Sequence, residues 1–171
     1  FGLGAALFLG GLAPNIAPAA DFAVNSSADD GSPGTMRWAI DQLNAAGPGS
    51  HSITVDDSIN GISMTGSLPH IDATGMTVVI NGFGATLDGG DQHRLLFVVA
   101  GNVTLLNFNL ENGLAEGGDA GSGSGGGGGG LGAGGALFVN TGANVTLNNV
   151  NFDSNAAEGG NGGNGGIANG G

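Results

Sequence analysis

The chain has 171 residues, of which 39 are glycine, two are basic and 14 are acidic, and its formal net charge is −12. Two cations cannot neutralise a nucleic-acid backbone or an anionic membrane surface, so nucleic-acid binding and a polybasic membrane patch are excluded. The chain has no cysteine, which excludes a disulfide framework, a thiolate metal site and a cysteine nucleophile.

Residues 1–20 are mostly apolar. The stretch 1–12 is too short to span a bilayer, and small residues follow it. This pattern is typical of the hydrophobic region and cleavage site of a signal peptide. We therefore predict a signal-peptide remnant over residues 1–20, with an N-terminal arm or first strand as the alternative. The chain begins with Phe1 and stops within a glycine-rich run, which favours a fragment of a longer protein.

Residues 21–52 are predicted to form an N-terminal cap that contains one helix, over residues 35–46. Glycine and proline flank this helix on both sides, and its apolar residues fall on one face: Met36, Ile40 and Leu43. Together with Trp38, this face can cover the exposed end of a following stack of strands. An ordinary surface helix makes nearly the same prediction.

Residues 53–171 show a different pattern, with pairs of apolar residues one position apart, broken by Gly, Asn and Asp. This period of two indicates strands, which are very short and separated by frequent turns. Early pairs are Ile53 and Val55, Ile62 and Met64, and Val78 and Ile80.

An internal repeat organises this region. Residues 102–110 match residues 144–152, and the match continues from 115–118 onto 157–160. Without the glycine tract between the copies, each unit has about 22 residues and three apolar pairs. The pairs are Leu96/Val98, Val103/Leu105 and Phe108/Leu110, and then Leu137/Val139, Val145/Leu147 and Val150/Phe152. Three strands per unit, each with one face inward, predict stacked triangular coils of parallel strands.

Glycine concentrates in two insertions, residues 116–134 and 159–171, after equivalent Ala-Glu-Gly-Gly positions. Neither is followed by the Lys-Ser/Thr of a phosphate-binding loop. The first has one aspartate, Asp119, instead of the regular aspartates of calcium-binding glycine repeats. The favoured interpretation is a flexible loop between coils, and the alternative is an ordered, packed polyglycine surface for partner contact.

Several motifs resemble those of bacterial surface proteins. One set resembles the GGA(I/L) and FxxN motifs of polymorphic outer membrane protein repeats: Gly134, Gly135, Ala136 and Leu137, followed by Phe152 and Asn155. Residues 34–45 resemble the cap of right-handed parallel β-helices in bacterial surface proteins, and residues 86–90 resemble the coil that commonly follows it. The resemblance implies secretion and a surface-exposed β-helix, often the passenger of an autotransporter.

We therefore predict an all-β chain, a right-handed parallel β-helix with a short N-terminal capping helix, at the bacterial outer surface or secreted. The expected role is structural or adhesive: a segment that displays loops to surface proteins or carbohydrates of host or neighbouring cells. No cofactor or catalysis is expected, and membrane attachment would run through an anchor region outside these residues. The alternatives are the N-terminal part of a β-helix polysaccharide lyase or hydrolase, and a scaffold subunit of a surface assembly.

One polar cluster is the candidate for catalysis: Asp88, Asp91, His93 and Arg94. Two carboxylates with a histidine and an arginine could cleave a polysaccharide by acid/base chemistry. The favoured interpretation is a tight turn, because the sequence Asp-Gly-Gly-Asp strongly favours turn formation. His51 and His70 are isolated in the sequence, so no metal site is predicted.

Asparagine is frequent in the second copy of the repeat: Asn148, Asn149, Asn151 and Asn155. The favoured interpretation combines turn formation with stacking of side-chain amides between coils. The alternative is a polar surface that faces a ligand.

Overall fold

The computed structural model describes residues 19–122 and 126–165, which form one helix, α1 (Met36–Ala45), and ten strands. The strands are β1 (Ala20–Val24), β2 (Gly49–Val55), β3 (Gly61–Ser63), β4 (Ile71–Asn81), β5 (Thr86–Asp88), β6 (Leu96–Glu111), β7 (Leu114–Glu116), β8 (Leu137–Val139), β9 (Ala143–Asp153) and β10 (Ala156–Glu158). The predicted all-β class is confirmed for this part of the chain. The predicted signal-peptide remnant lies outside the described residues, except for its last two positions.

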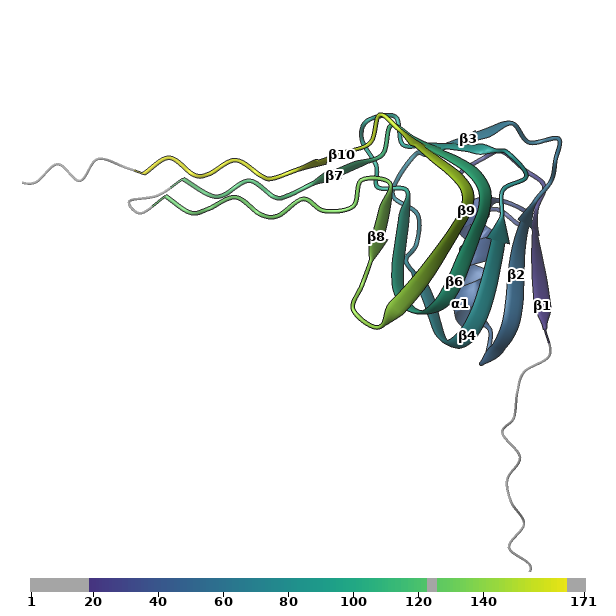
Figure 1. Cartoon of the computed structure of the whole chain (residues 1–171). Coiled ribbons are helices and arrows are strands. Elements are labelled where there is room, and N and C mark those ends of the chain that lie inside the picture. The colour runs from purple at the N-terminus through teal and green to yellow at the C-terminus, as the bar shows by residue number, and fades with distance from the viewer. Residues whose placement is uncertain (1–18, 123–125, 166–171) are drawn as a thin grey trace, which may run out of the picture.

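The strands form a curled parallel sheet (Figure 1). Every strand pair in it is parallel. β1, β2, β4 and β6 lie side by side in that order, and β9 pairs with β6. The short strands β3 and β5 continue the sheet from the far end of β6, and β7 pairs separately with β10. Each long strand therefore pairs with the next long strand along the chain.

The internal repeat sets the register of the last two long strands. Val103 of β6 lies opposite Val145 of β9, the matching position of the second copy, and Leu105 lies opposite Leu147. The column continues backwards, since Leu105 lies opposite Ile80 and Ile80 opposite Ile53. Apolar side chains of successive strands are thus stacked on one another.

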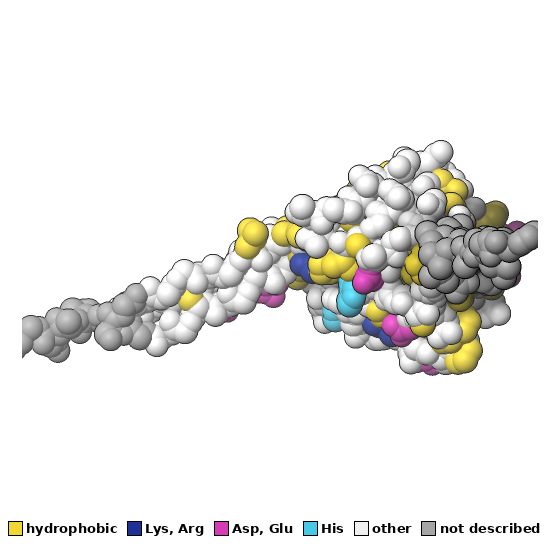
Figure 2. Space-filling view, turned by 90° about the horizontal axis from the view of Figure 1, so that it is seen from below, with side chains coloured by type: hydrophobic (Ala, Val, Ile, Leu, Met, Phe, Trp, Pro, Cys, Tyr) yellow, Lys and Arg dark blue, Asp and Glu magenta, His cyan; other side chains and the backbone are white. Residues whose placement is uncertain are grey.

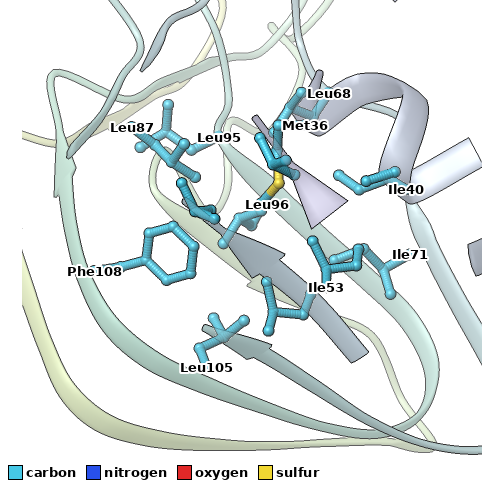
Figure 3. Packing of buried hydrophobic residues seen from close by; sticks show 14 of the residues in the cluster. Met36, Ile40, Ile53, Leu68, Ile71, Leu87, Leu95, Leu96, Leu105 and Phe108 are labelled. Atoms are coloured by element: carbon cyan, nitrogen blue, oxygen red, sulfur yellow. The ribbon is translucent and has the colours of Figure 1, made fainter. Parts of the chain in front are cut away.

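The concave side of the sheet holds the core (Figure 3). Ile53, Leu105 and Phe108 point into it and are at most 1 % exposed. The second copy of the repeat differs, because Leu147 is 44 % and Phe152 is 48 % exposed. No described strand stacks beyond β9, so the apolar side chains of that strand lie at the rim of the core.

α1 packs against β1, β2 and β4 and contributes to the core. Its first turn is capped by the Thr35 side chain, which accepts a hydrogen bond from the Trp38 amide. Met36, Ile40 and Leu43 are fully buried against the sheet, whereas Trp38 is only partly buried. The predicted helix over 35–46 is confirmed to within one residue at each end.

The sheet extends further toward the N-terminus than the apolar pairs indicate. β1 lies before the helix, and β2 begins at Gly49. Gly49 and Ser50 pair with Met76 and Thr77 through the backbone, which needs no apolar side chain. The segment assigned as a cap, residues 21–52, therefore contributes to two strands of the same sheet.

A buried ion pair ties the segment after β1 to the helix. Asp29, whose side chain is fully buried, accepts hydrogen bonds from Arg37 at 2.7 Å and 3.1 Å. The same carboxylate accepts from the Thr65 amide, while Arg37 also donates to the carbonyls of Gly66 and Ser67. This network holds α1 to the segment between β3 and β4.

Side-chain amides of asparagine stack between strands, as predicted for Asn149 and Asn151. In each pair, one asparagine donates to another on the neighbouring strand: Asn107 to Asn81, Asn144 to Asn102, Asn149 to Asn107 and Asn151 to Asn109. Asn148 instead lies opposite Leu106, and the Asn155 side chain bonds to backbone atoms. Asn107 and Asn149 also have φ of 54° and 53°, a left-handed conformation that asparagine tolerates better than most residues.

Candidate functional site

Three extended glycine-rich segments leave the body side by side and form a projecting arm (Figure 1). They comprise residues 117–122, 126–133 and 159–165, and we call them together the glycine arm. Its backbone hydrogen bonds run between the segments and to their base: Gly117 to Glu158, Ala120 to Asn161, Gly130 to Gly118, Gly160 to Gly130 and Gly163 to Gly127. In two of the segments the donors lie three residues apart, Gly117 and Ala120 in one and Gly160 and Gly163 in the other, which is the repeat of a polyproline-II-type helix.

Glycine is sterically required along one row of the arm and its base. A Cβ atom at Gly126, Gly129, Gly132 or Gly135 would lie within 3.0 Å of the backbone of the segment that starts at Ala156. Real Cβ atoms essentially never come that close, so these positions exclude other residues. A flexible loop is therefore the wrong description of the described part of this tract. The alternative, an ordered and packed polyglycine structure, is what the hydrogen bonds show.

Arg94 anchors the base of the arm. Its Nε and Nη2 atoms donate to the carbonyl oxygens of Gly134 and Ala133, at 3.2 Å and 2.8 Å. Its guanidinium carbon also lies 5.7 Å from the ring centres of both Phe97 and Phe138, within cation–π range. The side chain is thereby held in one orientation.

Aromatic side chains form a row beside Arg94. Phe97 of β6 and Phe138 of β8 are register partners, with ring centres 5.0 Å apart in an edge-to-face arrangement. The His70 ring centre lies 6.5 Å from that of Phe97. Because Leu96 and Val98 point into the core, strand alternation places Phe97 on the outer face.

Two hollows of about 270 Å³ and 260 Å³ meet at Arg94 and Phe97. We call them together the arm-base groove, lined by Ser67, Leu68, Pro69, His70, Arg94, Leu95, Phe97, Leu131, Ala133 and Phe138. Figure 2 shows a basic side chain among hydrophobic ones at the base of the arm, with histidine next to them. The groove thus combines a cation with aromatic and aliphatic surface.

The two arginines of the chain have different surroundings. Arg37 is paired with Asp29. Among residues 19–122 and 126–165, Arg94 has no carboxylate within ion-pair distance, and its Nη1 atom donates no hydrogen bond. Arg94 is therefore the cation able to meet an external anion.

The predicted catalytic cluster lies on a turn. Asp88 accepts hydrogen bonds from the Gly90 amide and the Asn112 side chain, both at 2.9 Å. These bonds, that of Asn112 above all, lower the pKa of Asp88, which keeps it ionised and unsuited to act as a general acid. Asp91 has a left-handed φ of 55°, as the predicted turn requires.

The other two members of the cluster have separate roles. The backbone of His93 bonds to Gly89 and Leu114, whereas the Arg94 side chain reaches the base of the arm. Within the described ranges, no hydrogen bond or ion pair joins either aspartate side chain to His93 or Arg94. Of the four predicted residues, Arg94 alone lines the groove.

The motif residues of the second copy connect strands and turns. Gly134, with φ of 67°, offers its carbonyl to Arg94, and Gly135 and Ala136 accept from the amides of Leu95 and Leu96. Leu137 pairs with Leu96, and Phe152 with Leu110. The Asn155 side chain accepts from the Gly113 amide and donates to the Leu110 carbonyl.

Sequence patterns alone do not single out Phe97, Leu131 and Phe138 as site residues. Phe97 and Phe138 occupy matching outer positions in the two copies of the repeat, and this match is the signal that could have found them. Leu131, which is 89 % exposed, interrupts a run of glycine and is the other signal.

Residues 19–122 and 126–165 contain no cluster of three or more His, Asp or Glu side chains able to hold a metal ion. No helix among these residues is long and apolar enough to cross a membrane. Comparison with protein-family models, with curated proteins and with solved structures finds no match to this chain.

Proposed function

We propose that this chain is a segment of a secreted or outer-surface bacterial protein with a structural and adhesive role. In this proposal the curled sheet is a right-handed parallel β-helix of the autotransporter passenger type. The support is the in-register stacking of successive long strands, with Val103 on Val145 and Asn107 on Asn149. Such stacks form rigid rods that hold projecting elements away from their base.

The projecting glycine arm carries the adhesive part of the proposal. Its residues are hydrogen-bonded to one another, and a side chain at many of them would collide with backbone. Glycine loses more conformational entropy on ordering than any other residue, so an ordered arm of glycines is costly to maintain. An ordered arm outside the core, with a lined groove at its base, is an arrangement suited to meet a partner.

The test is a bead-binding assay on immobilised bacterial and host polysaccharides and extracellular proteins. Beads carrying the chain are compared with beads on which a short Ser-Gly linker replaces residues 118–130, so that Leu131 of the arm-base groove is kept. We expect the intact chain to bind at least one coating, and the shortened chain to bind it less with unchanged thermal unfolding of the body. Retention by no coating would contradict the adhesive role, and release of soluble sugar fragments would favour the lyase or hydrolase alternative.

A further inference from the structure

We infer that the arm-base groove binds an acidic glycan, a sugar chain that carries carboxylates. In this arrangement one carboxylate bonds to Arg94, and the neighbouring sugar rings lie against Phe97 and Phe138. The inference rests on the proposed function only in one respect, namely that the chain meets the glycan at a cell surface. The binding itself can be measured on the purified chain.

Arg94 is the one Lys, Arg, Asp or Glu side chain in the lining of the two hollows. The chain carries 14 acidic residues, yet none is among the residues that line the two hollows. Asp72 interacts with His70 of the lining but lies outside the lining itself. The pKa of Asp72 is lowered chiefly by the hydrogen bond from the Thr74 hydroxyl and only in small part by the electrostatic effect of His70. Arg94 therefore stands in the groove without an internal counter-ion in the described structure.

The position of the guanidinium suits a carboxylate. Nε and Nη2 are occupied by backbone carbonyls, and the rings of Phe97 and Phe138 hold the group from the side. The remaining Nη1 carries two protons for an incoming oxygen. A charge-assisted hydrogen bond to a group already fixed in place loses little side-chain entropy on binding.

The aromatic row suits the carbon-bound hydrogens of a sugar. These hydrogens are weakly positive, and the faces of aromatic rings are negative. Leu131 and Leu68 add aliphatic surface in the two hollows of the groove. A sugar ring with one apolar face and one carboxylate can therefore contact the aromatic side chains and Arg94 at the same time.

The two hollows of the groove offer two adjacent positions for a ligand. Each hollow, at about 270 Å³ and 260 Å³, is smaller than a typical enclosed ligand pocket of about 300–1,000 Å³. The two share Arg94 and Phe97, so they form adjacent positions along one line. Adjacent shallow positions match consecutive units of a chain.

The experiment is a titration of the whole chain with a hexuronate oligomer and with the same oligomer after reduction of its carboxylates to alcohols. We expect the acidic oligomer to bind, and the neutral one to bind about tenfold or more weakly. Arg94→Gln should remove this difference, and Phe138→Ala should weaken binding of both oligomers. Phe83→Ala, which removes a ring that is 54 % exposed and not part of the groove, should change neither.

Arg94→Gln also removes an anchor of the arm, so Arg94→Lys is the second variant. It keeps the charge, and it should retain part of the preference for the acidic oligomer even if the arm loosens. Equal affinity for both oligomers, unchanged binding by Arg94→Gln, no binding of the acidic oligomer, or preference for an acidic peptide would each overturn the inference. Failure of this inference is distinguishable from failure of the proposed function. The bead assay measures adhesion that depends on the glycine arm, to any coating, whereas the titration measures binding of a hexuronate oligomer at Arg94.

Discussion

Asn149 donates its side-chain amide to Oδ1 of Asn107 at 2.9 Å, and Asn107 donates in turn to Asn81 at 3.0 Å. The ladder stacks one strand on the next along the sheet, and its central member also holds a left-handed backbone at φ 54°. Asn107 thus combines a hydrogen-bonding role with a conformational one.

Asn107→Ala should therefore lower the free energy of unfolding by about 2 kcal/mol, since it removes the ladder bonds and strains the left-handed backbone. Asn107→Gly removes the same bonds without that strain and should cost less. Urea unfolding of the two variants measures the difference. Equal losses would show that the backbone conformation contributes nothing.

The core column offers a matched pair of leucines, one in each copy of the repeat. Leu105→Ala should lower the free energy of unfolding by about 2–5 kcal/mol, because Leu105 is fully buried. Leu147→Ala, at its 44 % exposed register partner, should cost less than about 1 kcal/mol. Thermal or urea unfolding of both variants checks this. Similar costs at the two positions would mean that the rim beyond β9 is covered in solution.

The buried carboxylate of Asp29 should be among the most sensitive polar positions. Asp29→Asn leaves Arg37 without its ion-pair partner and should lower the free energy of unfolding by about 3 kcal/mol. Asp57→Asn, on an exposed aspartate, is the control and should have little effect. A small loss from Asp29→Asn would indicate that the carbonyls of Gly66 and Ser67 suffice to hold Arg37.

The chain should lose stability as the pH falls below about 4. Asp56 accepts hydrogen bonds from the hydroxyl and the amide of Ser58, which lower its pKa from the ordinary 3.8. Similar turns lower the pKa of Asp30 and Asp72. Because the folded pKa is the lower one, the unfolded chain binds protons first, so this stabilisation is present above the ordinary pKa and disappears as the pH falls through the folded pKa.

Urea unfolding at neutral pH and at about pH 3 measures this loss. Ser58→Ala removes the hydroxyl bond to Asp56 and should make the loss smaller. An identical pH dependence in that variant would show that the Ser58 hydroxyl does not contribute.

The glycine arm contains neighbouring positions with opposite surroundings. A Cβ at Gly129 would collide with the carbonyl of Gly160, whereas a Cβ at Gly128 would have nothing within 4 Å. Gly129→Ala should therefore speed hydrogen exchange at the amides of Gly160 and Gly163, and Gly128→Ala should not. Both variants should unfold at the same temperature as the parent chain, because the arm lies outside the core. Equal exchange in the two variants would contradict the packed arm.

Side-chain patterns in the sequence predict the parts of the fold that depend on the spacing of apolar side chains. The repeat indicates that residue 103 matches residue 145, and this match is the observed register. The helix over 35–46 follows from its apolar face and its flanking residues. The burial of the second copy could not be predicted in the same way, since Leu147 has the pattern of Leu105 and differs only in having no described strand stacked above it.

The candidate site depends on contacts that no local pattern records. Arg94 reaches the carbonyls of Ala133 and Gly134 on the far side of the glycine tract, so the visible feature in the sequence is a turn with nearby carboxylates and not the groove. The order of the glycine arm could not be predicted from the sequence either, because it comes from backbone packing between three segments. Glycine has no side chain whose spacing could have indicated that contact.

The corner at which the arm leaves the body has a consequence for how such chains can vary. Between Val78 and Val103 the chain passes from β4 to β6 without an arm, whereas between Val103 and Val145 it passes from β6 to β9 and includes the arm. Both pairs are nevertheless in register, because the added residues extend outward between β7 and β8 without shifting any strand. The register of the body strands therefore does not depend on whether this corner carries an insertion, so insertions of another length can be placed there, whether by evolution or by grafting.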